Sequence, residues 1–165
     1  MPRSTWTAFA VAGKNRQREG SDATQGVTRL GLDSAPVIYL VEMHPRYDYL
    51  VSELFRQIAA GHFLGVTSVV TLGEVMVVPL REGRVDIARR YRRLLLSSPG
   101  VRTSNIDPLT AERAAALRAK YGIRLPDALQ LAVAIEERCE AFLTNDRRLA
   151  RVTELRVLVL DDLEL

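Results

Sequence analysis

The feature that most constrains the fold is an alternation of short apolar runs with longer segments of helical periodicity, which starts at residue 28. The apolar runs do not alternate with polar residues, so both faces of each predicted strand are expected to be buried. The predicted strands cover 28–33, 62–68, 100–106, 141–144 and 155–161, and the predicted helices cover 34–43, 47–61, 69–78, 84–98, 107–122, 126–139 and 146–152. Buried strands separated by helices form a parallel sheet between two helical layers. The sequence therefore predicts an α/β fold with five parallel strands.

The length of 165 residues suits one domain, and the polar, non-periodic stretch before residue 28 places that domain at 28–165. We expect residues 1–27 to form a mobile tail. One hypothesis is that this tail is a start-site extension and that translation begins near Val27, which the mass of the natively expressed protein would test.

Composition excludes several classes of protein. Cys139 is the only cysteine, so the chain has no internal disulfide framework and no cysteine zinc site, and a reducing cytoplasm is the expected location. No apolar run approaches the ~18 residues that span a membrane. Of the net charge of +3, residues 1–28 contribute +2, so overall charge does not indicate a nucleic-acid partner.

Four acidic residues lie near the junctions between predicted strands and helices: Asp33, Glu74, Asp127 and Asp146. Ligands of parallel sheets bind outside the carboxyl ends of the strands, where all four side chains could meet. An aspartate at a helix start also has a purely structural role as a cap. Glu74 is harder to explain in that way, because its neighbours are apolar on almost every side and a buried, unpaired carboxylate is costly.

Four converging carboxylates repel one another unless cations compensate them. Oxygen ligands without histidine or cysteine favour Mg²⁺ or Mn²⁺ over zinc. The two histidines, His44 and His62, are expected to be plain surface residues. Carboxylates around divalent ions suit phosphoryl chemistry, in which the metal activates water and steadies the leaving oxygen.

The same residues carry a family resemblance. The ordered segments "LDSAPVIYLVE", "TSVVTLGEV", "RLPDALQLAVA" and "FLTNDRRL" resemble the motifs of PIN domains, and especially those of the VapC-like ribonuclease toxins of prokaryotic toxin–antitoxin pairs. The resemblance covers residues 29–163. It implies a three-layer α/β/α fold, with a parallel sheet in the order 3-2-1-4-5, and Mg²⁺- or Mn²⁺-dependent endonucleolytic cleavage of RNA.

Carried over by position, Asp33, Glu74, Asp127 and Asp146 match the acidic quartet that holds the metal in this family. Ser34 and Thr144 match supporting hydroxyl residues, and Asn145 completes the polar pair that shapes the turn before Asp146. One position departs from the pattern: many relatives have Asn two residues after the first acid, where this chain has Ala35. A hydrogen-bonding group is therefore expected to be missing near Asp33.

Basic residues suggest how RNA would be contacted. Arg89, Arg92 and Arg93 share one face of the predicted helix at 84–98, and arginine suits phosphate recognition. Arg147 and Arg148 follow the last acid and are expected to cap its charge or to contact phosphate. The alternative is that these arginines only form solvated faces of the protein.

The resemblance also implies protein partners. Relatives use the first two helical segments, together with the helix around Glu74, as a groove for an antitoxin peptide that lies near a homodimer contact. We therefore expect a cognate antitoxin and a homodimer. Core packing also accounts for most of the aromatic residues of this region, which are Tyr39, Tyr47, Tyr49 and Phe55.

Three other functions are alternatives to the ribonuclease interpretation. An aspartyl phosphatase needs a second Asp at position 35, where Ala35 stands. A nucleotide-binding module needs a glycine-rich first turn, which "LDSAPVIY" lacks. The third alternative is a catalytically weak PIN domain that acts as an RNA- or protein-binding module, and the departure at Ala35 favours it.

Overall fold

The structure is a computed structural model that describes residues 10–11 and 26–164. Its main sheet has five parallel strands in the order β4-β3-β2-β5-β6. The strands are β2 (Arg29–Leu32), β3 (Leu64–Ser68), β4 (Val101–Ser104), β5 (Ala141–Thr144) and β6 (Arg156–Val159). When β2 is counted as the first strand, this is the order 3-2-1-4-5, so the predicted fold class and strand order are confirmed.

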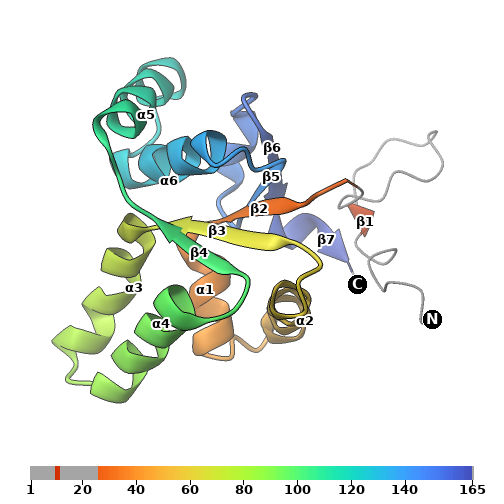
Figure 1. Cartoon of the computed structure of the whole chain (residues 1–165), viewed down its shortest axis with the longest axis vertical. Helices are drawn as coiled ribbons and strands as arrows, with labels where there is room; N and C mark the ends of the chain where they lie inside the picture. Colours follow the sequence, from red (N-terminus) through yellow and green to blue (C-terminus); the bar gives the residue numbers. More distant parts are fainter. Residues whose placement is uncertain (1–9, 12–25, 165) are drawn as a thin grey trace.

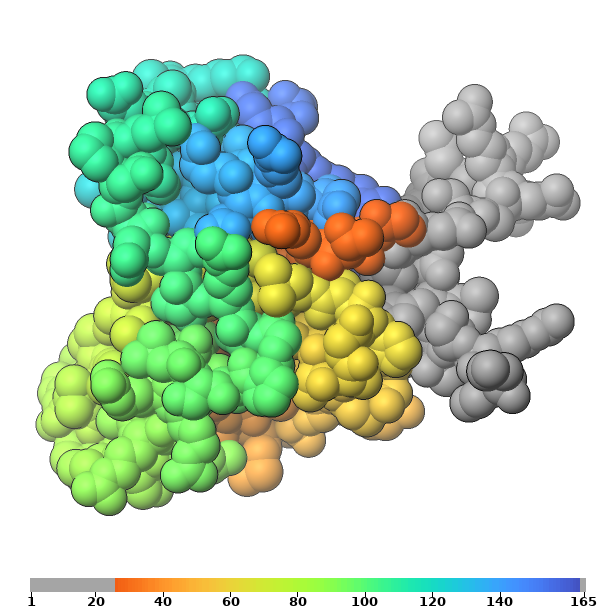
Figure 2. Space-filling view, in the orientation of Figure 1, coloured from red at the N-terminus to blue at the C-terminus, as the bar shows by residue number. Residues whose placement is uncertain are grey.

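Helices cover both faces of the sheet (Figure 1). They are α1 (Ser34–Val41), α2 (Asp48–Ala59), α3 (Val69–Arg81), α4 (Val85–Ser97), α5 (Pro108–Tyr121) and α6 (Leu125–Glu136). One part of the core lies between the sheet and α1, α2 and α4, and the other between the sheet and α5 and α6. Figure 2 shows two lobes of the molecule: the lower lobe contains α3 and α4, in yellow-green to green, and the upper lobe contains α5, in cyan-green.

Local signals account for several helix boundaries. Ser68 caps α3 by accepting from the backbone N–H of Val70 at 3.2 Å, and Asp107 caps α5 by accepting from that of Thr110 at 2.8 Å. Gly122 ends α5 in the left-handed conformation, with φ of 61°. The boundaries that they set lie within one residue of the predicted helix starts at 69 and 107 and the predicted end at 122.

The close contact between α6 and the sheet depends on Gly31 in β2. A Cβ atom at this position would lie 2.8 Å from the Cβ of Ala134 and 2.7 Å from the Cδ2 of Phe142. Only glycine therefore lets α6 approach β2 this closely. Ala134 lies in the last turn of α6, so this contact fixes that end of the helix against β2.

Some boundaries differ from the prediction. The predicted helix at 146–152 is a 3₁₀ helix, η2 (Arg147–Arg151), and a further 3₁₀ turn, η3 (Leu160–Asp162), follows β6. α3 continues to Arg81 with Pro79 inside it. Two short strands, β1 (Ala10–Val11) and β7 (Leu163–Glu164), pair in antiparallel fashion. β1 falls within the predicted tail of residues 1–27, and most of that prediction lies outside the described residues.

No helix in the described ranges, 10–11 and 26–164, has the length and apolar character needed to cross a membrane.

Candidate active site

A cavity of about 520 Å³ opens at the carboxyl edge of the sheet. It lies where β2 and β5 end, and where α1 and α6 contribute residues of their first turns and α3 contributes Glu74. Its lining comprises Asp33, Ser34, Ala35, Ile38, Tyr39, Glu74, Arg124, Asp127, Asn145 and Asp146. All four acids that the sequence singled out therefore line one cavity, although they are far apart in the chain.

Asp33 follows β2 directly and is the N-cap of α1. Its Oδ1 accepts a hydrogen bond from the backbone N–H of Ser34 at 2.7 Å, and its Oδ2 accepts one from the Thr144 hydroxyl at 2.5 Å. The Thr144 oxygen also accepts from the backbone N–H of Asp146 at 3.0 Å. Thr144 thus joins the first and last acids, in the supporting role that the resemblance implied.

Burial raises the pKa of Asp33 from 3.8 to about 6. The hydrogen bonds from Thr144 and from the Ser34 backbone oppose this increase, and the charges of Asp127 and Glu74 add to it. Asp33 is therefore the carboxylate whose negative charge is least stabilised by the protein alone. A cation in the cavity would relieve this cost.

The raised pKa of Asp33 predicts how the stability of the protein without metal depends on pH. The folded state favours protonated Asp33, so this residue destabilises the fold increasingly as pH rises from about 4 to about 6. The expected loss is at most about 3 kcal/mol, because one pKa unit corresponds to about 1.4 kcal/mol. Urea unfolding in EDTA from pH 4 to 7.5 would measure it.

Asp33→Asn is the matched variant for this measurement, since an amide does not titrate and still caps a helix. We expect the variant to lose this part of the pH dependence and to be the more stable protein at pH 7. Parallel pH profiles of wild type and variant would contradict the prediction.

Glu74 lies in the second turn of α3 and differs from its predicted environment. The sequence suggested a buried carboxylate, because the neighbours of Glu74 are apolar. Glu74 is exposed, and so are some of those apolar neighbours, such as Val77 and Val78. Its Oε2 nevertheless points into the site, where it accepts from the Ser34 hydroxyl at 2.5 Å and from the Gln130 amide at 2.7 Å. Side-chain contacts, and not burial, direct Glu74 toward the other acids.

Gln130 is a site residue that the sequence reasoning missed. It is only 3% exposed, and its Nε2 donates to Glu74 and, at 3.2 Å, to Ser34. Its Oε1 is the one buried side-chain nitrogen or oxygen within the described residues that lacks a hydrogen-bond partner. The available signal was its spacing: Gln130 follows Asp127 by three positions, which places both on one face of α6.

Asp127, in the first turn of α6, is only 6% exposed, and an arginine holds both of its oxygens. Arg124 donates from Nε to Oδ2 and from Nη2 to Oδ1, each at 3.0 Å. This fork of two parallel hydrogen bonds is the strong geometry of an arginine–carboxylate pair. Arg124 was also absent from the residues that the sequence singled out.

Asp146 caps η2 and is held in a similar way by Arg148. The Nε of Arg148 contacts both oxygens of Asp146 at 2.9 and 3.0 Å, and its Nη2 lies 2.5 Å from Oδ2. These bonds lower the pKa of Asp146. Arg147 instead pairs with Asp162, its Nη2 lying 2.7 Å from Oδ1. Of the two arginines predicted to cap the site, only Arg148 does so.

The chemistry of the acids fits a hard divalent cation, because every donor is an oxygen. Their positions are not those of a finished metal site: among the described residues, no three His, Cys, Asp or Glu side chains are placed to hold one ion. Arg124 and Arg148 occupy the oxygens of Asp127 and Asp146, so in this structure these two carboxylates are paired with guanidinium groups.

Asn145 does not contact the acids. Its Nδ2 donates to the hydroxyls of Tyr39 at 3.2 Å and Tyr47 at 3.1 Å, and its Oδ1 accepts from the backbone N–H of Asp161. Asn145 therefore anchors the turn to an aromatic cluster and supports Asp146 only through the backbone. His44 belongs to this cluster: it is half-buried, with ring centroids 4.6 Å from Tyr39 and 4.8 Å from Tyr47.

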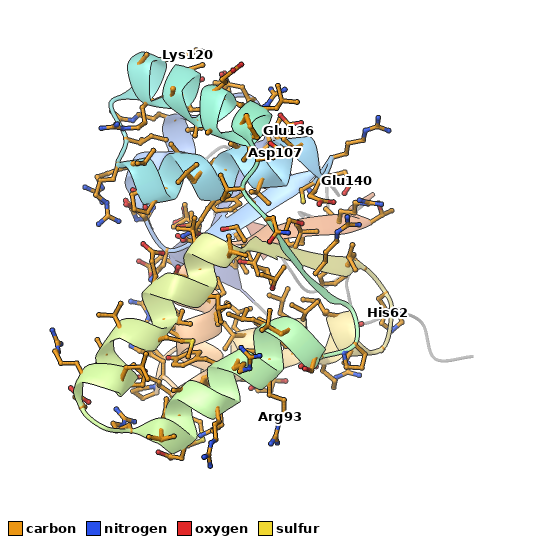
Figure 3. All side chains as sticks on the ribbon, turned by 60° about the vertical axis from the view of Figure 1, so that its left-hand side comes forward. His62, Arg93, Asp107, Lys120, Glu136 and Glu140 are labelled. Atoms are coloured by element: carbon orange, nitrogen blue, oxygen red, sulfur yellow. The ribbon has the colours of Figure 1, made fainter. Side chains whose placement is uncertain are left out.

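The expectation that His44 is a plain surface residue is therefore wrong, because its ring packs against two tyrosines. His62 is exposed beside the connection between α2 and β3, as predicted (Figure 3).

The predicted RNA track on α4 lies outside the cavity. Arg89, Arg92 and Arg93 are exposed, and within the described residues none of them forms an ion pair. Arg93 points away from α5 and α6 into solvent (Figure 3). Contact between this face and RNA stays a prediction.

The sequence profile of the PIN domain matches residues 32–155, which hold all four acids. The chain belongs to the PIN domain family. No curated protein matches it. Among solved structures, a toxin–antitoxin complex from Klebsiella pneumoniae contains a chain with 27% identity and a TM-score of 0.60, and the match covers 80% of this chain and 97% of that one.

Two further solved structures share the fold. The VapBC2 complex of Rickettsia felis, bound to a promoter DNA fragment, has a TM-score of 0.62 at 18% identity, over 79% of this chain and 98% of that chain. VapC20 of Mycobacterium tuberculosis, described as a sarcin–ricin loop cleaving toxin, has a TM-score of 0.60 at 19% identity, over 78% and 98% of the two chains. This PIN domain is thus similar to VapC toxins over nearly their whole length.

Proposed function

We propose that this PIN domain protein is a metal-dependent endoribonuclease and the toxin of a VapBC-type pair. The observation that carries the proposal is the meeting of Asp33, Glu74, Asp127 and Asp146 in one cavity at the carboxyl edge of the sheet. Four carboxylates in one cavity are costly in the protein alone and useful when they bind divalent cations. The structural neighbours among toxin–antitoxin complexes support the same assignment.

Mg²⁺ or Mn²⁺, when held by these carboxylates, would supply an acidified water and offset the charge on a phosphodiester. The chain's own residues orient the ligands. Ser34 and Gln130 direct Glu74 into the cavity, and Thr144 holds Asp33 while bonding the backbone of Asp146. Such supporting donors fix the orientation of metal ligands before the cation arrives.

The partner proposed for this protein is a cognate antitoxin. α3 exposes Val77, Val78 and Leu80 beyond Glu74, and these side chains are 56%, 41% and 58% exposed. An apolar segment of an antitoxin would bury them and would end close to the acids. We also propose a homodimer and a cytoplasmic location; the latter agrees with the single free thiol, Cys139.

Removal of metal tests the proposed activity directly. We expect the purified protein to cleave mixed cellular RNA in Mg²⁺ or Mn²⁺ and to leave it intact in EDTA, with activity restored by excess metal. Product lengths on a sequencing gel measure internal cleavage. Cleavage that persists in EDTA would contradict the proposal, because the proposed site relies on a bound cation to acidify the attacking water.

Ala35 favours a second candidate, a PIN domain that binds RNA without efficient cleavage. Its methyl group lines the cavity beside Asp33 and offers no hydrogen bond. The same assay decides between the two functions. Retained RNA binding, measured by filter retention, with no metal-dependent products would support the binding module over the nuclease.

A further inference from the structure

The four acids of the cavity are held by two kinds of donor. Uncharged groups hold Asp33 and Glu74, as described above. Guanidinium groups hold Asp127 and Asp146. The side chains of Arg124 and Arg148 are 65% and 66% exposed, while those of the two carboxylates are 8% and 25% exposed. Each pair therefore joins a carboxylate within the site to a long cationic side chain that reaches in from solvent.

We propose that Arg124 and Arg148 are exchangeable counter-ions of this site. They hold Asp127 and Asp146 when no divalent cation is bound, leave those carboxylates when a cation binds, and then contact a phosphate of the substrate at the mouth of the cavity. The last step rests on the proposed ribonuclease function. The first two concern only this chain and a divalent cation.

The energetics permit this exchange. The guanidinium ends of both pairs are about two-thirds exposed and are therefore screened by solvent, and a divalent cation brings twice the charge of an arginine to the same oxygens. The hydrogen bonds with Asp127 raise the pKa of Arg124, and the nearby positive charge of Arg148 opposes this rise. Repulsion between the two guanidinium groups disfavours keeping both beside the carboxylates. Two carboxylates that turn toward one divalent ion would instead gain from its double charge.

Once they have left the carboxylates, both arginines would lie where they can contact a phosphate of the substrate. Both side chains are attached beside the cavity, Arg124 just before α6 and Arg148 in η2. A guanidinium group binds phosphate through two parallel hydrogen bonds, the geometry that it now uses on the carboxylates. The same groups would therefore compensate the acids in the free protein and the phosphate in the complex.

Metal binding in the absence of RNA tests the exchange. Titration calorimetry with Mn²⁺ alone is expected to show about fivefold tighter binding for Arg124→Gln and for Arg148→Gln, because the cation then displaces no guanidinium group. Arg147→Gln is the matched control: Arg147 is 61% exposed and forms the same kind of fork, on Asp162 outside the cavity. Its Mn²⁺ affinity is expected to equal that of wild type.

Unchanged or weaker Mn²⁺ binding by both cavity variants would overturn the proposal. Arg124→Lys separates exchange from a simple change of charge, since lysine keeps the charge and loses the fork. Exchange predicts a Mn²⁺ affinity between those of wild type and Arg124→Gln. Thermal unfolding confirms that each exposed variant is folded.

A direct readout is the arginine Nε–H signal in nitrogen-15 NMR spectra during titration with diamagnetic Mg²⁺. The signals of Arg124 and Arg148 are expected to shift as the two guanidinium groups leave their carboxylates. That of Arg56, whose Nε donates to Glu53 at 2.8 Å outside the cavity, is expected to stay. Signals of Arg124 and Arg148 that do not move at saturating Mg²⁺ would overturn the exchange.

The phosphate contact is tested separately, by measuring the binding of a single-stranded DNA oligonucleotide. In Mg²⁺, Arg124→Gln and Arg148→Gln are each expected to lower the salt dependence of binding by about one charge, and Arg147→Gln to leave it unchanged. Equal salt dependence in all proteins would overturn the phosphate step. Exchange without RNA cleavage would overturn the proposed function alone, and cleavage without exchange would overturn this inference alone.

Discussion

Replacement of Asp33 by Asn is expected to reduce Mg²⁺-dependent RNA cleavage by at least about 100-fold. Groups that only orient a metal ligand contribute about 10- to 100-fold to affinity or activity, and a ligand itself contributes more. Asp33 lines the cavity together with the other acids, and the protein alone stabilises its charge poorly, since burial raises its pKa to about 6. The amide lacks that charge, and Mg²⁺ binds amide oxygens weakly. Initial rates on a labelled RNA measure the loss.

Asp107→Asn is the matched control for this prediction. Asp107 also follows a strand of the sheet and caps a helix, but it lines a different cavity, next to Glu136 (Figure 3). Asparagine caps a helix about as well as aspartate does, so this variant should keep its activity. Equal cleavage by wild type and Asp33→Asn would mean that the reaction occurs elsewhere or comes from a contaminant.

Replacement of Gln130 by Met is expected to lower cleavage by about 10- to 100-fold and to weaken Mn²⁺ binding. Methionine fills a similar volume and cannot donate to Glu74, so this exposed carboxylate would keep only its bond from Ser34. Because Glu74 lies on a solvent-facing part of α3, it would then spend more time turned out of the cavity. Rates over a range of Mn²⁺ concentrations separate weaker metal binding from a slower chemical step.

Gln57→Met controls for the loss of a buried amide. Gln57 is 2% exposed and donates from Nε2 to Glu53 at 2.6 Å on α2, so it is likewise a buried amide that donates to a carboxylate, but outside the cavity. Both variants are expected to lose about 1–3 kcal/mol of stability, and only Gln130→Met should lose activity. Similar activity of the two variants, with equal stability, would show that Gln130 has no role at the site.

The alternation of apolar strands with amphipathic helices was sufficient to predict the parallel sheet, because both signals are local and repeat along the chain. Helix caps such as Ser68 and Asp107 were equally visible, since a cap contacts backbone two or three residues away. The positions of the acids after strands predicted the edge where they would meet. The order of the strands came from the resemblance to PIN domains, since periodicity does not encode which strands are neighbours.

Only the tertiary structure decided how each acid is held. Glu74 was expected to be buried and is exposed, because the sequence of α3 does not reveal which apolar residues the rest of the protein covers. The contacts of Glu74 with Ser34 and Gln130 join three elements separated by 40 and 56 positions, and no local pattern records such a meeting. The fork of Arg124 on Asp127 spans only three residues, yet an arginine at that spacing could equally have faced solvent.

The sequence alone thus determined which elements form and at which edge of the sheet the carboxylates gather, because backbone hydrogen bonding and the burial of apolar side chains follow local periodicity. Tertiary packing determined which carboxylates bond to neutral donors and which to arginines. Those contacts depend on distances between side chains from separate elements, which are set only when the helices settle on the sheet.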